Sequence, residues 1–320
     1  MTRTDNKTIT ILGINGNIGH HAARAFLAAG WNVNGFGRSN KKPVAGVRFI
    51  KGDADHVRDM NQAVEGSSVV FNALNLPYDK WDNGRAETQV SKVIEAVKGN
   101  GRTLMFPGNI YNYAANLRKV TPDAPQNPET PRGAIRVRQE QMLQDATKGG
   151  DVQVIILRAG DFYAPNNEMD WYDQGLLREA GKGKVAIPSD PDIGHSWAYL
   201  PDFGEAFARV AAVRGDLGAF ENFHFEGHYV THGALVAAIR NVAPLPLKVV
   251  PFAWSMLKMI GIFMPMMREI VKMRYLWDHS MQLADPQLDA ILGKDFGTPF
   301  EQAVTQTVRP FFSDAAKLAA

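Results

Sequence analysis

The stretch Ile9-Thr-Ile-Leu-Gly-Ile-Asn-Gly-Asn-Ile-Gly-His20 decides the fold that this sequence predicts. Its apolar start is typical of a buried strand, and a Gly-x-x-Gly-x-x-Gly run leads from it into an amphipathic helix over 18–29. Gly13 permits a tight turn, and Gly16 leaves room for a pyrophosphate at the helix N-terminus. Gly19 lets the helix pack closely on the sheet. The alternative is a glycine turn with a purely structural role.

The composition of the chain excludes several classes of protein. Its 320 residues are enough for one elaborated domain or two closely packed ones, and 45% hydrophobic residues are ordinary for a soluble globular protein. A formal net charge of +2 argues against a nucleic-acid partner. The absence of cysteine excludes disulfides and thiolate metal sites. The polar start lacks the apolar core of a signal peptide, so we expect a cytoplasmic protein.

Strands and helices alternate along the first half of the chain. After the first helix, strands are predicted at 31–36, 47–50, 68–71 and 103–106, and helices at 57–64 and 84–98. We interpret this as a strand-helix unit repeated with short connections throughout, which indicates a parallel sheet covered on both faces. The predicted fold class is therefore α/β, a doubly wound parallel sheet of the Rossmann type. Its ligand is expected at the carboxyl ends of the strands.

The end of the second strand indicates which dinucleotide binds. In such a fold an acidic residue here holds the 2′-hydroxyl of NAD, whereas an arginine accommodates the 2′-phosphate of NADP. This chain carries Arg38 and Ser39, followed by Lys41 and Lys42, so NADP is expected rather than NAD. The alternative is a solvated basic loop. Asp53 follows the third strand, where a carboxylate either contacts the adenine or caps the next helix.

By these features the chain resembles the short-chain dehydrogenase/reductase superfamily, and within it the extended branch of NAD(P)-dependent epimerases and dehydratases. The matching features are the glycine spacing, Asp53 after the third strand, and Asn72-Ala73 after the fourth. Val154-Ile-Ile-Leu-Arg-Ala-Gly-Asp-Phe-Tyr-Ala-Pro165 resembles the sixth strand of this branch and its nicotinamide-contacting loop. The resemblance covers essentially the whole chain, and it is specific for fold and cofactor class rather than for substrate.

The resemblance implies a set of cofactor-binding residues along the carboxyl ends of the strands. They are Gly13, Asn15, Gly16, Asn17, Ile18, Gly19, Arg38, Ser39, Asp53, Asn72, Ala73, Arg136 and Tyr163.

The catalytic motif of that superfamily is missing from this chain. Its members carry Tyr-x-x-x-Lys at the start of the helix after the fifth strand, where the tyrosine exchanges a proton with the substrate oxygen. The lysine lowers the pKa of that tyrosine and binds the ribose. Glu140 aligns with a glutamate that commonly follows the lysine, which places Arg136 at the lysine and Arg132 at the tyrosine. Arginine is not deprotonated in proteins, so Arg132 cannot be the proton donor. Arg136 can still bind the ribose.

The run Phe106-Pro-Gly-Asn-Ile-Tyr-Asn-Tyr113 stands where members have a serine, and it is similar to an atypical subgroup that lacks the usual triad. If the protein is catalytic, we expect Tyr111 or Tyr113 to donate the proton, Asn109 to orient the carbonyl and Arg136 to supply positive charge. The alternative is that both tyrosines only pack beside the cofactor. Tyr163 is a third candidate, although its position suggests contact with the nicotinamide.

The rest of the chain is expected to form the substrate side. Residues 1–165 make the dinucleotide-binding domain, to which 195–225 return, while 166–194 and 226–320 make a smaller substrate or lid domain. A methionine-rich segment over 252–277 is interpreted as an apolar lid, a dimer face or ordinary core packing. Pro251, Lys258 and Pro265 interrupt its apolar run, so no membrane span is expected. No metal-ligand spacing is visible.

Two functions follow as hypotheses from the sequence. The first is an NADP-dependent oxidoreductase of the atypical extended type, which moves hydride to or from a carbonyl or alcohol carbon of an unidentified small molecule. If the methionine-rich segment is a lid, that molecule is more apolar than a sugar nucleotide. The second is a non-catalytic NADP(H)-binding sensor or assembly protein that retains the fold. Asp161 either faces the substrate or forms a turn, and His195 is expected to be structural. A homodimer is suggested by analogy alone.

Overall fold

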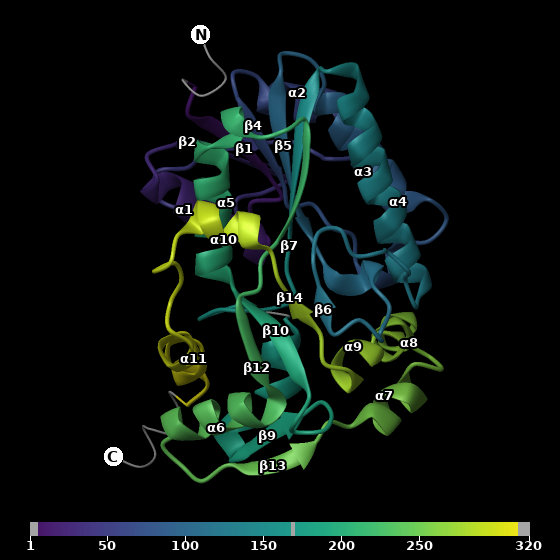
Figure 1. Ribbon diagram of the computed structural model, residues 1–320, viewed down its shortest axis with the longest axis vertical. Coiled ribbons are helices and arrows are strands. Elements are labelled where there is room, and N and C mark those ends of the chain that lie inside the picture. Colours follow the sequence, from purple (N-terminus) through teal and green to yellow (C-terminus); the bar gives the residue numbers. More distant parts are fainter. Residues whose placement is uncertain (1–5, 168–169, 313–320) are drawn as a thin grey trace.

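The computed structural model of the protein describes residues 6–167 and 170–312. Its main sheet consists of β1 (Thr8–Leu12), β2 (Asn32–Gly37), β3 (Arg48–Lys51), β4 (Val69–Asn72), β5 (Arg102–Gly108), β7 (Val152–Arg158) and β11 (Phe220–His224). These seven strands lie in the order β11-β7-β5-β4-β1-β2-β3, and every pair is parallel (Figure 1). The chain therefore runs outward from β1 in both directions. The glycine-rich turn after β1 lies at the point where the strand order reverses, which is where such sheets bind ligands.

Helices cover both faces of this sheet. On one face α1 (Asn17–Ala28) packs against α5 (Leu200–Ala212), and on the other lie α2 (Val57–Val64), α3 (Arg85–Val97) and α4 (Pro131–Ala146) (Figure 1). The strand residues alternate between two cores, as the twofold side-chain period of a strand requires. Ile11 and Phe71 point into one core, and Leu12 and Val70 into the other. The predicted doubly wound α/β fold is confirmed.

One step of the predicted alternation is wrong. Residues 38–47, between β2 and β3, contain no helix. This segment is rich in polar, proline and glycine residues and has no apolar face that a helix could bury. The Asn15 side chain holds it instead, because its Nδ2 donates to Ser39 O (2.7 Å) and its Oδ1 accepts from Lys41 N (2.9 Å).

The remaining strands form smaller sheets. One has the order β12-β10-β8 and consists of β8 (Asp161–Tyr163), β10 (Gly194–Tyr199) and β12 (His228–Thr231). Two strand pairs accompany it: β9 (Lys184–Ile187) with β13 (Lys248–Pro251), and β6 (Lys119–Val120) with β14 (Gln282–Leu283). After β10 the chain returns through α5 to the main sheet as β11. Helices α6 (His232–Val242), α10 (Pro286–Leu292) and α11 (Phe300–Val308) complete this part.

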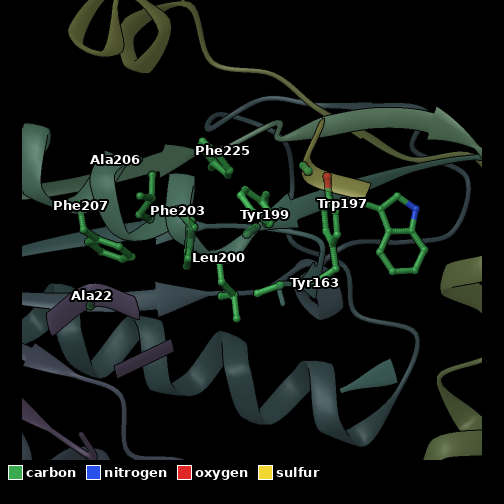
Figure 2. Close-up of a cluster of buried hydrophobic side chains, with 14 of the residues drawn as sticks. Ala22, Tyr163, Trp197, Tyr199, Leu200, Phe203, Ala206, Phe207 and Phe225 are labelled. Carbon is green, nitrogen blue, oxygen red and sulfur yellow. The ribbon is translucent and has the colours of Figure 1, made fainter. Parts of the chain in front are cut away.

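A continuous apolar core joins the main sheet to the smaller sheets. Figure 2 shows Ala22 from α1, Phe203 and Phe207 from α5, and Trp197 from β10 within one cluster of buried side chains. The rings of Phe203 and Phe207 meet edge to face, 5.0 Å apart. This packing keeps the smaller sheets in a fixed position beside the carboxyl edge of the main sheet.

The methionine-rich segment is partly core and partly surface. It forms α7 (Trp254–Ile260), α8 (Pro265–Lys272) and α9 (Tyr275–Asp278). Trp254, Met273 and Trp277 are buried in one cluster, which confirms core packing for that portion. The turn between α7 and α8 instead exposes large apolar side chains. Within residues 6–167 and 170–312, no helix combines the length and apolar character needed to cross a bilayer.

Candidate active site

The glycine-rich turn has the shape of a cradle for a pyrophosphate. A Cβ on Gly19 would lie 2.5 Å from Gly13 O, so this position requires glycine for the helix to pack. A Cβ on Gly16 would meet only Gly13 O, at 3.5 Å, so the space above Gly16 is open. No side chain caps α1 at Gly16, and the first turn of the helix holds no acidic residue. The backbone N–H groups of this turn can therefore receive an anionic group, and the residues fit a dinucleotide.

Asn15, Asn17 and Ile18 connect the glycine-rich turn to neighbouring parts of the structure. Asn15 fastens the basic segment after β2 next to the turn, while the side chains of Arg38 and Ser39 are exposed. The Asn17 amide donates to Asp170 Oδ1 (3.2 Å), which ties the turn to the chain beyond β8. Burial raises the pKa of Asp170 to about 7. Ile18 packs against the main core.

The next predicted cofactor residues form local turns at the same edge. The Asp53 carboxylate accepts from Asp55 N (3.0 Å), and the N-cap of α2 is His56. The alternative that Asp53 caps this helix is therefore wrong. Asn72 is buried, and its Oδ1 accepts from Leu74 N (3.1 Å). The carbonyl oxygen of Ala73 would lie 2.9 Å from a Cβ on Gly13, so this backbone packs directly against the glycine turn.

Two tyrosines meet at the carboxyl ends of β4 and β5. Tyr78 belongs to the short helix η1 (Tyr78–Lys80) after β4, and Tyr111 to η2 (Ile110–Asn112) after β5. Their hydroxyl groups hydrogen-bond to each other, and both side chains are half-buried. Burial raises the pKa of Tyr111 well above 10, and the charge of Asp161 adds to this; burial also raises the pKa of Tyr78. Both hydroxyls are therefore neutral at physiological pH.

Arg136 lies close to this tyrosine pair. It is buried on α4, with its guanidinium carbon 4.6 Å from the centroid of the Trp81 ring. The Trp81 ring in turn stacks on Tyr78 at 5.3 Å. The positive charge of Arg136 acts on both tyrosines, where it opposes the upward pKa shift caused by burial. Arg136 thus places its positive charge beside the tyrosine pair.

Two of the predicted catalytic residues have other roles. Tyr113 is fully buried, and its hydroxyl bonds to His224 Nε2 (3.1 Å), so the structure does not present it to a substrate and does not support its assignment as a proton donor. Residues two apart in this turn point in different directions, which separates Tyr113 from Tyr111. Asn109 Oδ1 accepts from Tyr111 N (3.1 Å) and thereby caps η2. Asn109 therefore positions the backbone of Tyr111.

Tyr163 does not present its side chain to the dinucleotide edge. Figure 2 shows Tyr163 beside Tyr199 in the buried cluster. Its ring also packs against Tyr172, and its hydroxyl bonds to His228 Nδ1 (2.6 Å). The expected contact of this ring with a nicotinamide is not supported, because the side chain is already enclosed in the core of the smaller sheets.

Arg132, at the position of the usual tyrosine, is locked in a charge network. It is buried, and both of its terminal nitrogens donate to the Asp82 carboxylate at 3.0 Å. Its Nε lies 3.2 Å from Glu269 Oε2 on α8. This side chain joins α4 to the segment after η1 and to α8.

A polar group from β8 and β10 approaches the tyrosine pair from the smaller sheets. Asp161 Oδ2 accepts from Trp277 Nε1 (2.7 Å), and His195 Nε2 lies 3.0 Å from the same oxygen. His195 is fully buried, in agreement with its expected structural role. Asp161 is half-buried and influences the pKa of Tyr111, so it belongs to the same site.

Sequence reasoning missed Tyr78 and Trp81. Both follow Pro77, a turn signal in the segment after β4, at the edge of the sheet where ligands bind. That signal could have directed attention to the segment, but the pairing of Tyr78 with Tyr111 depends on the sheet order. Among the described residues, no group of three or more His, Cys, Asp or Glu side chains is placed to hold a metal ion.

Comparison with solved structures shows where this architecture recurs. MoeE5 in complex with UDP-glucose and NAD is similar with a TM-score of 0.75 and 18% identity, over 97% of this chain and 99% of that one. UDP-glucuronic acid 4-epimerase from Bacillus cereus, solved with UDP-glucuronic acid and NAD, gives a TM-score of 0.76 at 13% identity, over 95% and 98% of the chains. UDP-glucose 4-epimerase from Brucella ovis, solved with NAD, gives 0.74 at 16%, over 96% and 98%. At such identities the likeness shows the fold.

The sequence itself matches a protein family. No curated protein matches the chain. Residues 9–219 match the model of the NAD dependent epimerase/dehydratase family, a range that begins in β1 and includes the glycine-rich turn, both tyrosines and α5. The chain belongs to the NAD dependent epimerase/dehydratase family.

Proposed function

We propose that the protein is an NADP-dependent oxidoreductase that acts on a carbonyl or alcohol carbon of a small molecule. The observation that carries this proposal is the hydroxyl pair of Tyr78 and Tyr111 beside the positive charge of Arg136. It replaces the missing Tyr-x-x-x-Lys with a different proton donor at the same edge of the sheet. The family match supports a nicotinamide-dependent reaction.

The bound cofactor would supply the hydride, and the described side chains account for the proton. The Tyr111 hydroxyl donates to the substrate oxygen, and the Tyr78 hydroxyl bonds to Tyr111 and orients it. Because burial raises the pKa of Tyr111 well above 10, its neutral form persists at physiological pH. The neutral hydroxyl can act as the acid when a carbonyl is reduced, and the positive charge of Arg136 offsets part of the rise in pKa that would weaken this acid.

The substrate can be sought in two chemical classes. Structural neighbours were solved with UDP-glucose or UDP-glucuronic acid, which makes nucleotide sugars the first class to test. The second is apolar carbonyl compounds, because an aromatic group lies next to Asp161. Trp171 stacks on Trp277 with ring centroids 4.3 Å apart, and Phe252 and Trp254 pack against Trp171.

A labelled cofactor tests the reaction directly. The protein is incubated with NADPH deuterated at C4, on either face in separate runs, together with nucleotide sugars or a metabolite extract. Mass spectrometry then searches for deuterium in new products, while cofactor binding is confirmed on the same sample. We expect a labelled product. Tight binding of NADPH without transfer to any sample would contradict the proposed activity.

That second outcome would favour a non-catalytic NADP(H)-binding sensor. One observation supports this alternative: Arg132 is held by Asp82 and Glu269 where the family's catalytic tyrosine would stand. A sensor would bind NADPH and NADP with different affinity and change its contacts accordingly, without turning over any substrate.

Arg38 is expected to select NADP over NAD. No acidic side chain follows β2, and Asn15 holds the segment carrying Arg38 against the glycine-rich turn. A hydrogen bond to a charged group contributes about 1.5–3 kcal/mol, so Arg38→Ala should weaken NADPH binding by about tenfold to 100-fold and leave NADH binding unchanged. Calorimetric titration of both cofactors measures this ratio. Arg48→Ala removes an exposed cation from β3 and serves as the control. Equal NADPH affinity in Arg38→Ala and wild type would exclude Arg38 as the 2′-phosphate ligand.

Gly16 and Gly19 are expected to respond differently to alanine. A Cβ on Gly16 enters open space, so Gly16→Ala should fold normally but weaken cofactor binding by about tenfold or more, because the methyl group occupies the pyrophosphate position. A Cβ on Gly19 meets the Gly13 carbonyl oxygen, so Gly19→Ala should lower stability by about 2–3 kcal/mol. Thermal unfolding and cofactor titration of both variants separate the two effects. Normal stability of Gly19→Ala would show that α1 can move away from the turn.

A further inference from the structure

The turn between α7 and α8 carries an exposed apolar tip. Phe263 is 86% exposed, Ile262 72% and Met259 64%. All three belong to the helical hairpin formed by α7, α8 and the turn between them. The tip as defined here consists of Met256, Met259, Ile260, Ile262, Phe263 and Met264, the exposed large apolar residues of this hairpin. An exposed group of this kind marks a surface that something else covers.

The Asp, Glu, Lys and Arg residues within 227–268, the interval that holds the tip, are all Lys or Arg. No aspartate or glutamate stands between Glu226 and Glu269 in the sequence, whereas Lys258 and Arg268 flank the tip on α7 and α8. Both cations are exposed. The tip is therefore an apolar group flanked by the cations Lys258 and Arg268. It is complementary to a surface with an apolar interior and negatively charged groups on its outside.

We propose that this hairpin docks the protein onto a bilayer that contains anionic phospholipids. Ile262 and Phe263 enter the boundary between headgroups and acyl chains, and Lys258 and Arg268 contact lipid phosphates. This inference does not depend on the proposed reaction. The bilayer is touched and not crossed, because α7 and α8 span only 7 and 8 residues, about 10–12 Å of helix against the ~30 Å of a hydrocarbon core.

A second copy of the chain fits this surface less well. A twofold contact would bring the same patch of both copies together, so Lys258 and Arg268 would face their own equivalents with no acidic side chain in the tip to offset them. Lipid phosphates supply the missing negative charge.

The start of α7 and the end of α8, which form the base of the hairpin, are anchored to the rest of the protein. The tip is therefore held in one position. Trp254 Nε1 donates to Pro188 O (2.7 Å), and Glu269 pairs with the buried Arg132. The nearby cations Lys272 and Arg274 are already paired within the base, with Glu269 and Asp278, and Arg268 Nε lies 3.9 Å from Glu269 Oε1. In Figure 1, α7 and α8 lie at an outer edge of the molecule, well away from α2 at the far end of the main sheet.

Co-sedimentation with vesicles tests the proposal. The full chain is mixed with vesicles of phosphatidylcholine alone or of phosphatidylcholine with phosphatidylglycerol, at low and high salt. We expect binding to the anionic vesicles that falls by about tenfold or more at high salt or without phosphatidylglycerol. A blue shift in tryptophan fluorescence should accompany binding of Phe263→Trp.

Surface variants separate docking from folding. The double variant Ile262→Ser/Phe263→Ser should retain the wild-type melting temperature, because both side chains are exposed, and lose vesicle binding by about tenfold or more. Lys258→Glu should weaken binding to anionic vesicles, whereas Arg58→Glu, which reverses a charge at an exposed position of α2, should not. Absence of binding to either vesicle, or full binding by the double variant, would overturn the proposal. A concentration-dependent dimer that the double variant abolishes would assign the tip to a second copy instead.

Discussion

Tyr111→Phe is expected to bind NADPH as tightly as the wild type and to turn over substrate at least about 100-fold more slowly. The hydroxyl of Tyr111 is the proton donor in the proposed reaction, and phenylalanine keeps the ring that packs at the end of β5. Tyr78→Phe removes the hydrogen-bond partner of Tyr111, so a smaller loss of about tenfold is expected. The rate of deuterium transfer to product in single-turnover experiments measures both effects.

Tyr113→Phe is the matched control for this pair. It removes an identical hydroxyl two residues away, but one that is fully buried and bonded to His224. We expect a stability loss of about 1 kcal/mol and unchanged turnover. Unchanged turnover in Tyr111→Phe would remove Tyr111 as the donor, and a loss in Tyr113→Phe at normal stability would return that role to Tyr113.

The pH dependence gives a second test of the same assignment. The donor form of Tyr111 is the neutral hydroxyl, and burial raises its pKa well above 10. The rate of reduction should therefore show no decline from ionisation of this tyrosine up to pH 10, its ordinary pKa, because the donor remains protonated. A decline that Tyr78→Phe shifts and Tyr113→Phe does not would mean that the pair ionises within this range.

The sheet and the glycine turn could be predicted because they depend on local patterns. The spacing of Gly13, Gly16 and Gly19 between a strand and a helix is a requirement of the backbone itself. The alternation in β1 and β4 follows from the twofold period of a strand. The strand-helix alternation fails between β2 and β3, because the polar segment there has no apolar periodicity and forms no helix.

The candidate catalytic group could be predicted only in part, because its members meet through the sheet order. The place of Tyr111 after β5 makes it a candidate in the sequence, but nothing in the sequence relates it to Tyr78 after β4. Tyr111 and Tyr113 have the same chemistry and differ by two positions, so only the direction of η2 separates a half-buried hydroxyl from a fully buried one. The enclosure of Tyr163 by Tyr172 and Tyr199 likewise depends on contacts between distant segments.

The largest loss of stability is expected from Glu140→Ala. Arg158 on β7 is fully buried, and it donates from Nη1 to Glu140 Oε1 (3.0 Å) and from Nη2 to Glu140 Oε2 (2.6 Å). Removal of the carboxylate leaves a buried guanidinium without a counter-charge, which costs about 3–5 kcal/mol. Unfolding in urea should therefore show a much lower midpoint, with full loss of the fold near body temperature if the wild type is marginally stable.

Two further variants distinguish this mechanism from a simple loss of contacts. Glu205→Ala breaks an exposed pair with Arg209 on α5, for which less than about 1 kcal/mol is expected. Glu140→Leu/Arg158→Met removes both buried charges at once and should recover much of the stability lost in Glu140→Ala, because no uncompensated charge remains. If the double variant is instead less stable than Glu140→Ala, the other partners of Arg158, among them His224 and the Asn109 carbonyl, carry the stability. In either case Glu140 acts by fixing α4 to β7, and through α4 it sets the position of Arg136 beside the tyrosine pair.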